Sequence, residues 1–176
     1  MRNVKLISAA LGIVASFSLL ACGSKDDPAA PACANKFDYS SYSTTAAPTI
    51  ADIDGILQTS CALPTCHGAT ATATNKEAPF LGNIGKASDA ATQMKIKMGL
   101  VGVASGDSDL KYVVANDPAN SWLMRKIEGT HTAACGNTCK GDTKAGPCGE
   151  SMPNGGELLA SGDIEKVRAW IKSGAN

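Results

Sequence analysis

The chain has 176 residues, of which 16 are basic and 16 acidic, so its formal charge at pH 7 is zero. This balance lacks the basic surplus that draws proteins to phosphate backbones, and we therefore expect no nucleic-acid partner. Aromatic residues make up only 5% of the chain, while glycine alone contributes 18 residues. A domain built from such small side chains has little bulk with which to fill its own core.

The N-terminal segment predicts export. Arg2 and Lys5 form a short basic region, and residues 6–20 are apolar but too few to span a bilayer as a helix. The run ends at Leu-Leu-Ala-Cys22, which resembles the lipobox of bacterial lipoproteins. The resemblance implies that residues 1–21 are a signal peptide and that Cys22 is acylated after cleavage. The alternative is an ordinary signal peptide followed by a chance cysteine.

Residues 22–48 are rich in Ala, Ser, Thr and Pro and show no helical apolar stripe, which predicts a flexible tether. Acyl chains on Cys22 would then hold a single domain, residues 49–176, at a membrane surface. Gly23, rather than Asp, follows Cys22. By analogy with enteric lipoproteins this favours the outer membrane over the inner, with the domain facing the periplasm or the cell surface.

The first helix of the domain is expected to run from Thr49 into Cys61. Pro48 precedes it, and Thr49 with Asp52 three residues later is the pattern of a capping box. Apolar residues then recur at helical spacing, at Ile50, Ile53, Ile56 and Leu57. The helix therefore leads directly into a cysteine.

Three further features are expected in the middle of the chain. A helix is predicted over 88–97, and two short β-branched runs at 100–103 and 112–114 are candidates for strands. Asp117 and Pro118 then supply an N-cap and a first-turn proline. They should open a short amphipathic helix that Gly129 closes, with its apolar residues at Trp122, Leu123, Met124 and Ile127.

Residues 130–156 contain three cysteines, many glycines and almost no apolar side chains, which predicts a disulfide-stapled loop outside the core. Met152 and Pro153 lie near its end. A closing helix is expected with Ser161 as its N-cap and Gly174 as its stop. Its apolar face consists of Ile164, Val167, Trp170 and Ile171. The predicted fold class is mostly α.

One motif carries recognisable chemistry. The sequence Cys61-Ala-Leu-Pro-Thr-Cys66-His67-Gly68 places two thiols before one of only two histidines in the chain. Such a group can attach haem, because two thiols can add to the haem vinyl groups while the adjacent imidazole binds the iron. The usual spacing is C-x-x-C-H, however, and here four residues separate the cysteines. On its own the group could equally be a small disulfide loop beside a histidine.

Two physical points favour haem attachment. Extra residues between the thiols can bulge outward without moving Cys66 relative to His67. Gly68 should give the backbone room where it turns away from the cofactor.

The order of the pieces resembles class I cytochromes c, and more closely the small planctomycete-type cytochrome c domains. The matching pieces are the first helix with Cys66-His67-Gly68, the stretch 114–127, Met152-Pro153 and the closing stretch 163–175. The four-residue spacing departs from the family's usual pattern, although it occurs among multihaem cytochromes. The resemblance implies a cytochrome c-like helical domain around one covalently bound haem c.

By that resemblance, Cys61 and Cys66 carry the thioethers. His67 is the proximal iron ligand and Met152 the distal one. A soft thioether sulfur stabilises ferrous iron, and two strong axial ligands leave no position open for oxygen or peroxide. This ligand set implies an electron carrier that serves redox partner proteins, and not an enzyme.

Other side chains compete with Met152 for the sixth position. His131 would lower the potential, but it is expected to be a solvated residue of the polar loop. Met94, Met98 and Met124 lie among apolar neighbours and are expected to pack in the core. Both tryptophans are likewise expected between helices.

The remaining cysteines point to disulfides, because export places them in an oxidising compartment. Besides Cys22 there are six, an even number that fits three disulfides, or one haem and two disulfides. With haem on two of them, three connectivities stay open for Cys33, Cys135, Cys139 and Cys148. Zinc is disfavoured, since no second pair with suitable spacing accompanies these cysteines.

Two other functions stay open. One is a haemless, disulfide-rich lipoprotein that keeps a cytochrome-like fold and serves as an interaction module, with Cys61 and Cys66 bridging each other. The other is a haem enzyme with a labile sixth ligand, which requires that Met152 not bind iron.

Overall fold

The computed structural model describes residues 47–69, 78–86, 89–141, 148–155 and 158–176. The predicted signal peptide, Cys22, Cys33 and nearly all of the tether lie outside these ranges.

The described chain is mainly helical, as expected. Its helices are α1 Ile50–Ser60, α3 Ala90–Leu100, α4 Trp122–Ile127 and α5 Ser161–Lys172, with 3₁₀ turns η1 Pro118–Asn120 and η2 Ala133–Cys135. None of the helices in this part of the chain has the length and apolar character needed to span a bilayer.

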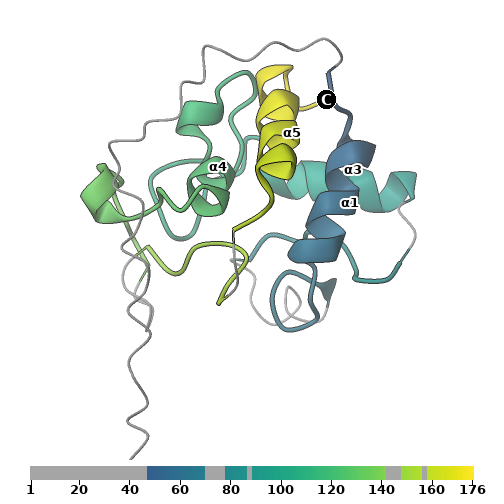
Figure 1. The fold of residues 1–176 in the computed structure, drawn as a ribbon, viewed down its shortest axis with the longest axis horizontal. Coiled ribbons are helices and arrows are strands. Elements are labelled where there is room, and N and C mark those ends of the chain that lie inside the picture. Colours follow the sequence, from purple (N-terminus) through teal and green to yellow (C-terminus); the bar gives the residue numbers. More distant parts are fainter. Residues whose placement is uncertain (1–46, 70–77, 87–88, 142–147, 156–157) are drawn as a thin grey trace, which may run out of the picture.

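Helix α5 lies between α1 and α4 and packs against both, while α3 packs against α1 (Figure 1). The expected apolar face of α5 is buried in this core, and Trp170 is completely covered. The Trp170 indole N–H donates to the carbonyl of Asn176 (3.0 Å), so this polar atom is satisfied in the interior. The helix begins at Ser161 itself, with Ala160 as its N-cap, one residue earlier than expected for the cap.

Helix α1 begins and ends as expected. The Thr49 N–H donates to the Asp52 carboxylate (2.7 Å), and the Asp52 N–H donates to the Thr49 carbonyl (3.0 Å). Ile53 and Leu57 are fully buried against the other helices. The Cys61 N–H donates to the Leu57 carbonyl (2.8 Å), so the helix ends at the first cysteine of the motif.

Helix α3 begins and ends later than the predicted range 88–97. The Asp89 carboxylate accepts the Thr92 N–H (2.6 Å) and so sets the start at Ala90. The Val101 N–H still donates to the Lys97 carbonyl (2.9 Å), which carries the helix on to Leu100.

The expectation that all three rival methionines pack in the core was wrong for two of them. On α3 only Ile96 and Leu100, four residues apart, are buried. Met94 and Met98 each precede one of them by two residues and therefore point to the other side of the helix, where they are 55% and 71% exposed. Met124 on α4 is fully buried, as expected.

The two β-branched runs pair, but as isolated bridges and not as strands. Val101 bridges Val113, and the Gly102 N–H donates to the Val113 carbonyl (2.9 Å). Gly102 has a positive φ of 78°, which interrupts the extended path immediately after α3. The described residues therefore contain no strand from either run.

Asp117 and Pro118 open a 3₁₀ turn instead of α4 itself. The Asp117 carboxylate accepts the Asn120 N–H (3.2 Å). The helical path is then interrupted at Ser121 before α4 begins. The Ser121 hydroxyl donates to the Asp117 carbonyl (2.8 Å) and accepts the Val114 N–H (2.9 Å). Gly129, with φ of 69°, follows α4 as expected.

A buried ion pair joins α5 to the end of α4. Arg168 on α5 is 4% exposed and lies 2.5 Å from the carboxylate of Glu128, which is fully buried. Arg168 also pairs with Glu165 one turn earlier on its own helix. Because a buried carboxylate is costly without a partner, this pair makes the α4–α5 packing specific.

We expect Arg168→Met to lower the free energy of unfolding by about 3–5 kcal/mol, because it leaves Glu128 buried without its cation. Chemical denaturation monitored by circular dichroism measures the loss. Lys166→Met is the matched control, since Lys166 lies on the same helix but is exposed and forms a surface ion pair with Asp163, so its cost should stay below about 1 kcal/mol. Equal denaturation midpoints for the two variants would contradict the role given to the buried pair.

Candidate functional site

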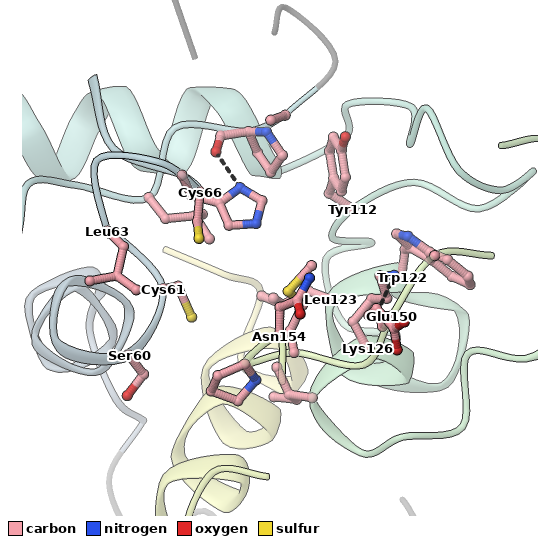
Figure 2. Close-up of a pocket in the computed structure, with 18 of the residues that line it drawn as sticks. Ser60, Cys61, Leu63, Cys66, Tyr112, Trp122, Leu123, Lys126, Glu150 and Asn154 are labelled. Atoms are coloured by element: carbon pink, nitrogen blue, oxygen red, sulfur yellow. Dashed lines mark hydrogen bonds between the residues drawn. The ribbon is translucent and has the colours of Figure 1, made fainter. Parts of the chain in front are cut away.

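A cavity of about 440 Å³ lies between the end of α1 and the segment 148–154, a volume typical of ligand and cofactor sites. Its wall contains every residue that the sequence predicts to bind a cofactor: Cys61, Cys66, His67 and Met152. In Figure 2, Cys61 and Cys66 stand on one side of the cavity, and Trp122, Lys126 and Glu150 on the other. The fold thus brings together two segments that are far apart in the sequence.

The two cysteines are free thiols that differ in burial. Cys61 is buried where α1 ends, and Cys66 is half-buried in the turn that follows. Burial, with a smaller contribution from Cys66, raises the pKa of Cys61 to about 11, so this thiol stays protonated at neutral pH. The bridge between Cys61 and Cys66 required by the haemless alternative is not present in the structure.

The spacer between the cysteines bulges into solvent, as expected. Leu63, Pro64 and Thr65 are all exposed. The Leu63 carbonyl accepts both the Cys66 N–H (2.9 Å) and the Gly68 N–H (3.0 Å). One carbonyl of the spacer therefore holds the backbone on both sides of His67.

Gly68 lies close against the backbone of the spacer. A Cβ atom at Gly68 would lie 3.0 Å from the carbonyl oxygens of Ala62 and Leu63, which is tighter than nine in ten real Cβ contacts. The glycine therefore makes room for the spacer, which folds back over it. That it also gives the backbone room beside a cofactor stays a prediction.

His67 has the protonation pattern of a metal ligand. Its Nδ1 lies 3.0 Å from the Pro79 carbonyl, which can only accept, so Nδ1 carries the proton and Nε2 keeps its lone pair. Burial lowers the pKa of His67 below its usual 6.5, although the bond to Pro79 opposes the shift. The imidazole is therefore neutral at pH 7. Pro79 carries no signal in the sequence that would have revealed this contact.

Met152 is half-buried at the edge of the core, and its N–H donates to the Lys126 carbonyl (3.1 Å). The rival ligands His131, Met94, Met98 and Met124 are absent from the cavity wall, within the described residues.

The segment that carries Met152 starts at a disulfide. Cys139 and Cys148 are bonded, with their Cα atoms 4.9 Å apart, which confirms the predicted staple and selects one of the connectivities left open. Cys135 is also disulfide-bonded. The staple places residues 149–154 directly after a fixed point, and these residues form one wall of the cavity.

His131 is buried, and the expectation of a solvated residue was wrong. It is 6% exposed, its Nε2 lies 3.0 Å from the Gly149 carbonyl, and its ring meets the edge of Trp122. The reason is the left-handed turn at Gly129, which folds the chain back over the end of α4. Loop composition alone does not reveal this contact.

Trp122 and Lys126 form the cavity wall on α4. Trp122 is buried, yet within the described chain its Nε1 has no hydrogen-bond partner. Lys126 is 6% exposed, and burial lowers its pKa, opposed mainly by Asp107. Lys126 is not among the residues predicted from the sequence, although its position four residues after Trp122 places it on the same helix face.

Comparisons of the chain with protein-family models, with curated proteins and with solved structures find no match.

We expect Gly68→Ala to destabilise the protein by about 1–3 kcal/mol, because the added methyl group meets two backbone carbonyls that cannot rotate away. The matched control is Gly55→Ala, since Gly55 lies within α1 and has nothing within 4 Å of its Cβ position. There the change should stabilise the helix by up to about 1 kcal/mol. Denaturation midpoints of the two variants measure the difference, and a neutral Gly68→Ala would refute the close approach of the spacer.

Proposed function

We propose that this protein is an electron carrier of the cell envelope that holds one covalently bound haem c in the cavity. The observation that carries the proposal is the meeting of the paired thiols, the neutral histidine and the distant methionine at a single cavity. These residue types correspond to two thioethers and two axial ligands. The resemblance of the chain order to class I cytochromes c supports the same function.

The chemistry of the cavity fits this group. Both thiols are free, as thioether formation requires. His67 offers Nε2, and the buried indole N–H of Trp122, a residue of the cavity wall, has no acceptor among the described residues. A bound haem would supply an iron that exchanges one electron between its ferrous and ferric states.

The residues of the chain would attach the haem, bind its iron and keep water away from it. Cys61 and Cys66 would hold the group at the end of α1. His67 and Met152 would bind the iron and so leave no position for oxygen or peroxide. Apolar side chains keep water from much of the wall, among them Leu81, Leu100, Leu123 and Ile127. Such a site favours electron transfer to and from redox partner proteins over catalysis.

The lipobox-like end of the leader supports a membrane anchor. Acyl chains on Cys22 would hold the domain at a membrane surface, with the residues up to 48 as its tether. Gly23 favours the outer membrane by the analogy given above.

The alternatives have less support. A haemless module with a bridge between Cys61 and Cys66 is at odds with two free thiols. A haem enzyme needs an open or weakly held sixth position, whereas Met152 lines the cavity and its amide is hydrogen-bonded to α4.

Expression of the full chain in a host with a haem ligation system tests the proposal. We expect a Soret band and an intact mass increased by one haem, because two free thiols face one cavity. The double variant Cys61→Ser/Cys66→Ser should lack the covalent mass increment. A chain without haem, produced beside a control cytochrome that the same host does load, would refute the proposal.

Met152→Ala should remove the sixth ligand. We expect loss of the low-spin spectrum, carbon monoxide binding to the ferrous form, and a reduction potential lower by roughly 0.1 V, a part of the range that axial ligands span. Met98→Ala is the control, since Met98 is exposed on α3 and outside the cavity wall. Spectra and potential unchanged in Met152→Ala would rule out this residue as the ligand.

A further inference from the structure

Lys126 makes hydrogen bonds with three alternate residues, 148, 150 and 152, of the segment that carries Met152. Its Nζ donates to the carbonyls of Cys148 (2.8 Å) and Glu150 (2.5 Å). Its own carbonyl accepts the Met152 N–H (3.1 Å). One side chain and one backbone group of α4 therefore hold three points along residues 148–152.

The surroundings leave Lys126 little freedom. The side chain is 8% exposed, and Nζ lies 5.5 Å from the centre of the Trp122 ring. Gly149 passes directly over it, since a Cβ at that residue would lie 3.1 Å from Nζ. The carboxylate of Asp107 is 4.0 Å away, beyond a hydrogen bond. The ammonium donors are thus used mainly on the carbonyls of the Met152 segment.

A buried lysine lowers the stability of the folded protein unless its ammonium group is hydrogen-bonded. Burial removes the ammonium from water, and only good hydrogen bonds repay that loss. An apolar residue would suit a buried site between Trp122 and Ile127 but could not bind the carbonyls of residues 148 and 150. The contacts of Lys126 therefore determine where Met152 stands relative to α4.

We propose that Lys126 is the positioning residue of the sixth iron ligand: it holds residues 148–152 against α4 so that the Met152 sulfur stays on the iron. This rests on the proposed function. Lys126 does not bind the iron itself, and its role is to keep the ligand-bearing segment closed.

Lys126→Met in the haem-loaded full chain tests the proposal, because methionine has a similar length and no donors. We expect the haem mass increment and the Soret band to remain, since the thiols and His67 are unchanged. The ferrous form should bind carbon monoxide at least about tenfold more tightly than the unmutated protein, because the open state becomes more populated. Lys140→Met is the matched control, as Lys140 lies in the loop that leads to the Met152 segment but is exposed and pairs with Asp109.

A double variant separates positioning from general destabilisation. If Lys126 acts through Met152, Lys126→Met/Met152→Ala should bind carbon monoxide as Met152→Ala does, with no added effect. Additive effects would overturn the proposal, as would unchanged carbon monoxide affinity in Lys126→Met. Absence of haem from the unmutated protein would overturn the proposed function and this inference with it.

A second variant covers the case in which Lys126→Met does not fold. Gly149→Ala keeps the lysine but adds a methyl group 3.1 Å from Nζ at a residue with φ of 64°. It should also increase carbon monoxide affinity, while amide hydrogen exchange quickens at Met152 more than in α1. A folded, haem-loaded Gly149→Ala protein with unchanged affinity and exchange would count against the proposal.

Discussion

The packing of α5 against both α1 and α4 is the constraint on which the cavity depends. Helix α1 ends in the turn that carries the thiols and His67, while α4 carries Lys126 and, through it, the Met152 segment. Helix α5 packs against both helices and so holds the two sides together. The buried pair between Arg168 and Glu128 makes this arrangement specific. A shift of α5 along α4 would move Arg168 away from the buried Glu128 carboxylate.

Polar groups around the cavity have interior positions that side-chain packing alone does not explain. Lys126 is buried among backbone carbonyls, and the Trp122 indole has no acceptor in the described chain. Each of these carries a desolvation cost in a domain whose own side chains are small. A flat, mainly apolar group with a few acceptors would fill the volume and stabilise the folded state.

Much of the helical content and the thiol-histidine motif was predictable from the sequence, but the other half of the site was not. The capping box of Thr49 and Asp52 and the stripe of Ile53 and Leu57 were visible because they act within four residues. The far wall depends on Lys126 and on the burial of His131, which come from contacts with Cys148 and Gly149 across a disulfide loop.

The sequence by itself determined where α1 and α5 form and that cysteines pair in the loop before α5, because hydrogen bonds and side-chain periodicity within a helix are local and export favours disulfides. Only the tertiary structure decided that Met94 and Met98 face solvent, that the β-branched runs stop at single bridges, and that Cys61 and Met152 share one cavity. Those outcomes depend on which surfaces meet between distant segments. Which surfaces meet is set by the packing of the whole domain and cannot be inferred from any short stretch of the chain.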